Sequence, residues 1–186
     1  MVVGYPGAQY KSYNTYEAAL KAYRGNYEDE IKVLRNIARG PSEQINYAAI
    51  PEIGPGCVAV DAACSGNPGA MEYRGVDIDT GAEIFHKSFP LGTNNIGEFL
   101  AIVHALALFH KNGMGHITIF SDSKIAQGWV AQRTCRSKLA ESDQTRELLD
   151  IVKRAETWLQ THTPTNPVKK WKTEEWGEIP ADFGRK

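Results

Sequence analysis

Four acidic residues stand where hydrophobic patterning alone would not place them: Asp61, Glu98, Asp122 and Asp182. Two of them end short apolar runs, one lies in the first turn of a predicted helix, and one follows Pro-Ala near the end of the sequence. A carboxylate at the end of a buried strand loses hydration and must be paired or bind a cation. Strand ends and a helix start can meet at one edge of a sheet, and no basic partner is obvious. We therefore predict a site for two magnesium ions, with manganese as a substitute.

Each acid also has a purely structural explanation. Asn95-Ile-Gly-Glu98 has the spacing of a capping box, and Asp122 precedes Ser-Lys, where it would cap the next helix. Asp182 would be a solvated charge. Asp61 is the hardest to explain in this way, because it directly follows a buried run. Periodicity alone therefore leaves both a carboxylate site and ordinary structural roles open.

The apolar pattern predicts the elements that would position these acids. Residues at helical spacing predict helices over 96–110, 123–132 and 142–159. Short apolar or alternating runs predict strands over 57–61, 71–79, 82–89, 116–120 and 168–171. Strands mixed with helices in this order indicate an α/β domain with three layers and a five-stranded mixed sheet flanked by helices.

Composition restricts the classes of protein that fit. The chain has 186 residues, 42% hydrophobic and 23% charged, with a formal net charge of −1. A polyanion would therefore have to be held by a local basic patch or by metal ions. Three widely spaced cysteines favour neither disulfides nor a zinc site, and no signal peptide or membrane-spanning run is evident. We expect a cytoplasmic protein without a membrane association or an obligate protein partner.

Three segments are predicted along the chain. Residues 1–27 read as a small α+β unit that cannot bury a core of its own. Residues 28–56 read as a charged helical connector that ends in a Pro/Gly-rich stretch. Residues 57–186 contain all four acids and form the predicted catalytic domain.

Four sequence motifs resemble those of the ribonuclease HI family, in order and in spacing. They are Asp61-Ala-Ala-Cys-Ser-Gly-Asn-Pro-Gly69, Gly92-Thr-Asn-Asn-Ile-Gly-Glu-Phe-Leu-Ala101, Phe120-Ser-Asp-Ser123 and Trp176-Gly-Glu-Ile-Pro-Ala-Asp182. The resemblance implies the ribonuclease H fold and an endonuclease that hydrolyses the RNA strand of RNA–DNA hybrids, leaving 5′-phosphate and 3′-hydroxyl ends. It also implies that the four acids bind two metal ions, with Asp61 bridging both, Glu98 and Asp122 on the nucleophile side, and Asp182 on the other ion.

The same resemblance implies residues that touch the substrate. The turn after the first aspartate and the Asn-Asn pair would contact the hybrid in its minor groove. Thr93 matches a position that holds a DNA phosphate, and Lys124 stands where relatives often carry a glutamine near the RNA strand. Asparagine amides both donate and accept, which suits an RNA 2′-hydroxyl. The predicted contacts are Cys64, Asn67, Thr93, Asn94, Asn95 and Lys124.

The chain departs from the family pattern in three respects. The usual histidine before the last aspartate has no counterpart between Trp171 and Asp182, and Glu178 is our first candidate for its role. The basic handle that grips the hybrid is shortened to Arg133, Arg136 and Lys138 in the segment 132–138. Residues 1–27 resemble only the second half of the hybrid-binding, viroplasmin-like module found ahead of some ribonucleases H.

Two other functions compete with this interpretation. One is a DNA-cutting nuclease of the same fold, against which the Asn94-Asn95 pair argues because it suits 2′-hydroxyl recognition. The other is a hybrid-binding protein without catalysis. The presence of all four acids argues against it, since a binding protein does not need a costly acidic cluster.

Overall fold

The computed structural model describes residue 15 and residues 46–184. Residues 46–184 belong to one compact unit, which holds all four acids and the four motifs that resemble ribonuclease HI. The predictions for the segment 1–27, and for most of the connector 28–56, therefore lie outside the described residues. The three-segment division of the chain stays a prediction. Within the described part of the chain, no helix combines the length and the hydropathy that crossing a membrane requires.

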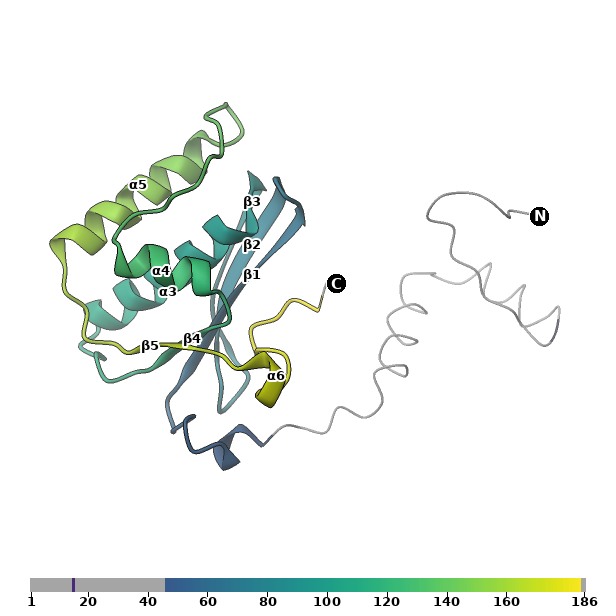
Figure 1. The fold of residues 1–186 in the computed structure, drawn as a ribbon, viewed down its shortest axis with the longest axis vertical. Coiled ribbons are helices and arrows are strands. Elements are labelled where there is room, and N and C mark those ends of the chain that lie inside the picture. The colour runs from purple at the N-terminus through teal and green to yellow at the C-terminus, as the bar shows by residue number, and fades with distance from the viewer. Residues whose placement is uncertain (1–14, 16–45, 185–186) are drawn as a thin grey trace. The chain divides into compact units, whose positions relative to one another are not determined.

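Five strands form a single mixed sheet in the order β3-β2-β1-β4-β5 (Figure 1). β1 pairs antiparallel with β2, β2 pairs antiparallel with β3, and β4 runs parallel to both β1 and β5. The strands are β1 Val58–Gly66, β2 Gly69–Asp77, β3 Glu83–Gly92, β4 Ile119–Ser121 and β5 Val168–Lys170. The predicted α/β class and the mixed sheet are thereby confirmed.

Helices lie on both sides of this sheet, so the domain has three layers. Figure 1 shows α3, α4 and α5 together on one side, and α6 with the C-terminal segment on the other. A short 3-10 helix, η1, precedes β1. The bounds are η1 Tyr47–Ala49, α3 Asn94–Lys111, α4 Lys124–Ala131, α5 Arg146–Thr161 and α6 Thr173–Trp176.

Alternation along β1 divides the apolar residues into two cores. Val58, Val60 and Ala62 face the core beneath α3, α4 and α5. Ala59 faces a second core, which contains the fully buried Trp171 and the buried Trp176 of the C-terminal segment. Because successive strand residues point to opposite faces, Asp61 shares the face of Ala59. The first of the four acids therefore lies on the side covered by the C-terminal segment.

A close approach between α3 and β1 fixes the second acid relative to the first. A Cβ built on Gly97 would lie 2.7 Å from the Cβ of Ala62 and 2.7 Å from the sulfur of Met71. Only glycine fits there without a shift of the helix or the strand. Gly97 and Ala62 directly neighbour Glu98 and Asp61 in the chain, so this contact brings the helix that carries Glu98 against the strand that carries Asp61.

The largest differences in extent from the sequence-based prediction are in β1 and α5. β1 continues to Gly66, because it pairs with β2 over its whole length, so Asp61 lies inside the strand and not at its end. α5 starts at Arg146, four residues later than predicted. Before it, Thr145 Oγ1 accepts a hydrogen bond from the Ser142 amide at 2.8 Å, and this local turn competes with the helix.

Candidate functional site

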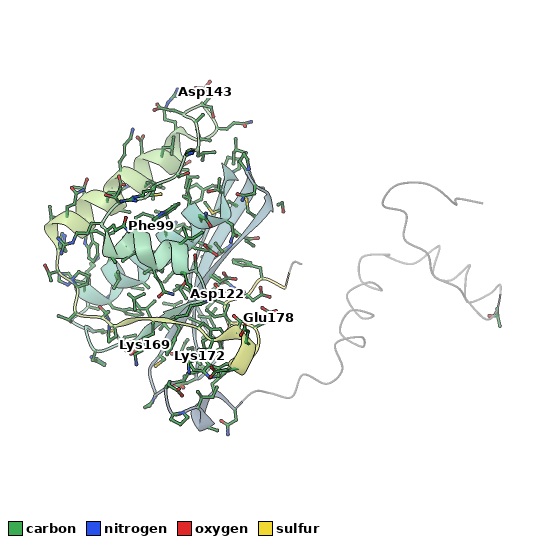
Figure 2. The ribbon with its side chains drawn as sticks, in the orientation of Figure 1. Phe99, Asp122, Asp143, Lys169, Lys172 and Glu178 are labelled. Carbon is green, nitrogen blue, oxygen red and sulfur yellow. The ribbon has the colours of Figure 1, made fainter. Side chains whose placement is uncertain are left out.

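Three of the four acids converge at the junction of β1, α3 and β4. Asp61 lies in β1, Glu98 in α3, and Asp122 directly after β4 (Figure 2 labels Asp122). One carboxylate oxygen from each residue lies within 4.8 Å of the others, close enough for a shared metal ion. Carboxylate oxygens are the ligands that magnesium and manganese prefer.

Burial and mutual repulsion make this cluster costly in its fully ionised form. Asp61 is 7% exposed and Glu98 is 9% exposed. Burial, and then the charge of Asp122, raise the pKa of Asp61 to about 8. Burial is also the main reason that the pKa of Glu98 rises to about 7, with Asp122 adding to it. A divalent cation among these oxygens would relieve both the desolvation and the repulsion.

The helix caps at this site are supplied by hydroxyl residues and not by the acids. Thr93 Oγ1 accepts a hydrogen bond from the Ile96 amide at 3.4 Å at the start of α3. Ser123 Oγ accepts from the Ala126 amide at 3.1 Å at the start of α4. Glu98, in the second turn of α3, has no capping function. Glu98 therefore does not cap α3, and the residue that caps α4 is Ser123 and not Asp122.

Polar neighbours orient Glu98 and the loop that carries Asp122. The amide nitrogen Nδ2 of Asn94 donates to Glu98 Oε1 at 2.9 Å, and a hydrogen bond from Ser123 lowers the pKa of Glu98. The ammonium of Lys170, in β5, donates to the backbone carbonyl of Asp122, and its charge also lowers the pKa of Glu98. No basic partner of the acids is obvious from the sequence, but β5 pairs with β4 and thereby brings Lys170 near them, with its hydrogen bond on a main-chain carbonyl.

Asp182 reaches the site from the C-terminal segment. It lies outside the set of three converging oxygens, but its charge contributes to the raised pKa of Asp61. Its carboxylate Oδ2 accepts a hydrogen bond from the Gly184 amide at 2.8 Å. Arg74 donates from Nε to the carbonyl of Ala181 at 2.9 Å and from Nη2 to the carbonyl of Asp182 at 2.7 Å. The main chain of Asp182 is thus tied to β2.

Glu178 is exposed and lies in the stretch between α6 and Asp182 (Figure 2). Two other titratable residues of this segment, Lys172 and Glu175, lie close together. The ammonium of Lys172 lies 3.2 Å from Glu175 and 3.2 Å from Glu52, which precedes β1. Glu178 stays our first candidate for the role of the missing histidine.

Several predicted substrate contacts gather around the start of α3. Thr93, Asn95 and Asn67 line one hollow of about 530 Å³, together with Arg136 and Lys138 of the shortened basic segment. The thiol of Cys64 lies 3.4 Å from the carbonyl of Gly92 and 3.6 Å from that of Gly69, which ties the turn after β1 to the end of β3. Lys124 is exposed at the first position of α4.

Sequence reasoning missed two cations near the acids, Arg74 and Lys170. Arg74 carries a weak signal, because it shares a strand face with the apolar Val76 and is an unusual residue for that face. Lys170 carries none beyond lying in the last strand. The contacts of both depend on tertiary structure, since they join residues 107 and 48 positions apart.

The chain combines a three-layer α/β fold with three carboxylates that converge at the central sheet. A family model described as RNase H matches residues 56–177, which is more than half of the chain. The chain therefore belongs to the RNase H family.

Three solved structures are similar to the chain at low sequence identity. The N-terminal RNase H domain of a Mycobacterium tuberculosis protein, solved as a fusion with maltose-binding protein, is 20% identical, with 64% of this chain and 85% of that chain covered and a TM-score of 0.40. RNase H1 from the halophilic archaeon Halobacterium salinarum is 20% identical, with coverages of 69% and 93% and a TM-score of 0.40. LC11-RNase H1, in complex with an RNA/DNA hybrid, is 18% identical, with coverages of 64% and 87% and a TM-score of 0.40.

Proposed function

We propose that this protein is an endoribonuclease that hydrolyses the RNA strand of RNA–DNA hybrids and leaves 5′-phosphate and 3′-hydroxyl ends. The observation that carries the proposal is the largely buried cluster of Asp61, Glu98 and the half-buried Asp122 in a chain of the RNase H family. Burying carboxylates that repel one another lowers the stability of the fold, so their presence together at one point of the sheet supports a function for them.

The residues present fit divalent cations. Every donor of the cluster is a carboxylate oxygen, and burial, with the neighbouring acids adding to it, raises the pKa values of Asp61 and Glu98, so a cation would offset both effects. Two ions held there, Mg²⁺ or Mn²⁺ in its place, would act as Lewis acids that polarise the scissile phosphate and lower the pKa of an attacking water.

Each acid has a proposed role as a ligand. Asp61, the most deeply buried, would bind both ions. Glu98 and Asp122 would complete the site on the side of the attacking water. Asp182 would bind the second ion, which its influence on the pKa of Asp61 supports. Glu178 would act near that second ion and help the cleaved phosphate to leave by its charge.

Neighbouring residues keep these ligands in place. The hydrogen bond from Asn94 fixes the Glu98 carboxylate, and the bond from Lys170 holds the main chain of Asp122. Such neighbours of ligating residues orient the ligands and tune their affinity for the ion. Because Asn94 uses one amide N–H on Glu98, its carbonyl oxygen and second N–H stay available to an RNA 2′-hydroxyl.

Recognition of the hybrid would rest on the start of α3 and the turn after β1. Asn94, Asn95, Asn67 and Cys64 would contact the minor groove, where 2′-hydroxyls distinguish RNA from DNA. Thr93 would hold a phosphate of the DNA strand. Arg136 and Lys138 line the same hollow as Thr93 and would supply local positive charge, which the chain as a whole lacks.

Lys124, exposed beside Asp122, would lie near the RNA strand. The cytoplasmic location expected from the cysteines also stays a prediction, as does the absence of an obligate protein partner. A DNA-cutting nuclease of the same fold and a hybrid-binding protein without catalysis are the two outcomes that would replace the proposal.

One cleavage assay separates these functions. Three end-labelled duplexes of one sequence are compared in Mg²⁺, namely an RNA–DNA hybrid, duplex DNA and duplex RNA. We expect internal cleavage of the RNA strand in the hybrid alone. Efficient cutting of duplex DNA would favour the rival nuclease, and binding of the hybrid without cleavage in Mg²⁺ or Mn²⁺ would favour the binding protein.

A further inference from the structure

Arg74 occupies a special position relative to the carboxylate cluster. It lies in β2 directly opposite Asp61 of β1, and residues paired in this way across an antiparallel ladder point to the same face. That face carries the second core, against which the C-terminal segment packs. The side chain of Arg74 is 26% exposed, so it lies at the edge of this packed region.

The guanidinium of Arg74 is committed to the C-terminal segment. Its Nε and Nη2 donate to the carbonyls of Ala181 and Asp182 at 2.9 and 2.7 Å. The ring of Phe183 lies over it, with its centroid 4.6 Å from the guanidinium carbon. The remaining nitrogen, Nη1, lies 3.7 Å from a carboxylate oxygen of Glu83. The side chain of Arg74 therefore contacts three consecutive residues of the C-terminal segment, Ala181, Asp182 and Phe183.

The segment around Asp182 has little regular structure to hold it. α6 ends at Trp176, and the stretch that follows contains no helix or strand up to Gly184. The hydrogen bond that the Asp182 amide donates is local, to the carbonyl of Ile179 at 2.8 Å. Beside the packing of Ala181 in the second core, Arg74 thus supplies two hydrogen bonds that join the main chain around Asp182 to the sheet that carries Asp61.

We propose that Arg74 is a positioning residue that sets the place of the Asp182 carboxylate relative to Asp61, and so the affinity of the site for its second divalent ion. The inference rests on the proposed function in one respect, namely that Asp182 is a metal ligand. Arg74 touches neither ion nor substrate in this scheme, because both of its short hydrogen bonds go to main-chain carbonyls.

The geometry requires arginine and not merely a positive charge. Two donors on one planar group meet the carbonyls of two adjacent residues, while the flat face of the same group meets an aromatic ring. A lysine would carry the charge, but it has no rigid pair of donors and no flat face. Arg74→Lys should therefore retain only part of the effect, which separates positioning from simple electrostatics.

Calorimetric titration with Mn²⁺ tests the inference without relying on catalysis. We expect Arg74→Ala to weaken the binding of Mn²⁺ by about 10-fold, the scale found when partners of metal ligands are removed. Arg74→Lys should fall between this variant and the parent. Arg154→Ala is the matched control, because it removes an exposed arginine from α5, on the opposite face of the sheet, and should bind like the parent.

Amide hydrogen exchange gives a second readout that does not depend on metal. In Arg74→Ala, the amides of residues 181–184 should exchange faster than in the parent, while those of α3 should not change. Affinity for an RNA–DNA hybrid in the presence of a chelator should stay within about 2-fold of the parent. A general loss of stability would instead raise exchange throughout the domain and would contradict the inference.

The double variant with Asp182→Asn decides whether Arg74 acts through Asp182. In that background, Arg74→Ala should cause no further loss of Mn²⁺ affinity, because residues that act as a unit are not additive. A further 10-fold loss, or a single Arg74→Ala variant that binds Mn²⁺ within 2-fold of the parent, would overturn the inference. Should Arg74→Ala fail to fold, Arg74→Lys carries the same test.

These outcomes are separate from those of the proposed function. A parent protein that binds Mn²⁺, loses affinity on Arg74→Ala and yet cuts no hybrid would refute the nuclease and leave the positioning intact. The opposite result is a parent protein that cuts the hybrid and an Arg74→Ala variant that binds Mn²⁺ as the parent does. It would support the nuclease and refute the positioning role of Arg74.

Discussion

Asp61 carries the greatest electrostatic cost of the candidate site. Its carboxylate is buried inside a strand, with Asp122, Glu98 and Asp182 all raising its pKa, and its value of about 8 lies far above the ordinary one. A folded-state pKa above the unfolded one means that the folded protein binds the extra proton. The stability from this group is therefore complete below pH 4 and is lost as pH rises toward 8.

This leads to a prediction for the protein in a chelator. Between about pH 5 and pH 8 the melting temperature of the parent should fall relative to that of Asp61→Asn, which cannot ionise at this position. We expect a difference of several degrees at pH 8, since about 1 kcal/mol shifts the melting temperature of a domain of this size by ~2–4 °C. Thermal melts of the two proteins across this pH range measure it.

Adding Mg²⁺ should remove most of that difference by raising the melting temperature of the parent at high pH. Asp150→Asn, which alters a 62% exposed carboxylate on α5, is the control and should melt like the parent throughout. If the melting temperatures of the parent and of Asp61→Asn change with pH in parallel, this result would contradict the raised pKa of Asp61.

Glu178 makes a different prediction, because it is exposed and near the proposed second ion. We expect Glu178→Gln to slow steady-state turnover on a hybrid by roughly 10-fold, the order found for neighbours of metal ligands, with a much smaller change in KM. The cause would be slower departure of the cleaved phosphate. Steady-state kinetics of the variant and the parent measure both values.

Glu174→Gln is the control for this prediction, because Glu174 is an exposed glutamate of the same segment within α6. It should behave like the parent. Unchanged turnover of Glu178→Gln would remove Glu178 from the mechanism, and an equal loss in both variants would point to a general effect of charge.

The start of α3 is the element that joins the metal site to substrate recognition. Asn94 orients Glu98, whereas Asn95 lines the hollow that also contains Thr93. We expect Asn95→Ala to weaken hybrid affinity or turnover about 10-fold without changing metal binding. Asn94→Ala should lose turnover and also metal affinity, because it frees the Glu98 carboxylate. Filter-binding, turnover and Mn²⁺ titration of both variants distinguish the two effects.

Melting temperatures near that of the parent are the control for folding in both variants. The same loss of Mn²⁺ affinity in Asn95→Ala as in Asn94→Ala would contradict the assignment of Asn94 to the metal site and of Asn95 to substrate binding alone. Full activity of either variant on duplex DNA would favour the rival nuclease over 2′-hydroxyl recognition.

α3 and β1 illustrate how far the sequence predicts elements. The period of the apolar residues predicted α3 to within two residues of its observed start at Asn94, and the fold class was confirmed. The extension of β1 beyond Asp61 was not predicted, because residues 62–66 are small and include none of the β-branched or aromatic residues that favour strands, and pairing with β2 holds them in the strand. Tertiary pairing outweighs local propensity there.

The candidate site, like the fold, could be predicted from the sequence only in part. The types and positions of the acids were readable from the sequence, and the structure brings Asp61, Glu98 and Asp122 together. The residues that hold them were not readable. Arg74 reaches a carbonyl 108 positions away and Lys170 one 48 positions away, and no local pattern encodes such contacts. Their functional roles, like those of the acids, stay predictions.

At the scale of the whole molecule, the site lies where the two cores meet. Glu98 comes from a helix that packs on one face of the sheet, whereas Asp182 comes from a segment that packs on the other. Asp61 belongs to the central strand between them. Any change that loosens either layer should therefore displace a carboxylate and reduce activity before it unfolds the domain.

The most direct measurement is hybrid cleavage by metal-stripped protein before and after Mg²⁺ is restored, with Asp61→Asn and Asp122→Asn beside the parent and Asp143→Asn, a 92% exposed surface acid, as the control. We expect no cleavage in chelator, full recovery in Mg²⁺ for the parent and the control, and a loss of at least about 100-fold for the two site variants, with unchanged or higher melting temperatures. Cleavage that survives thorough chelation, or near-normal turnover of either site variant in Mg²⁺, would contradict a metal-dependent carboxylate site.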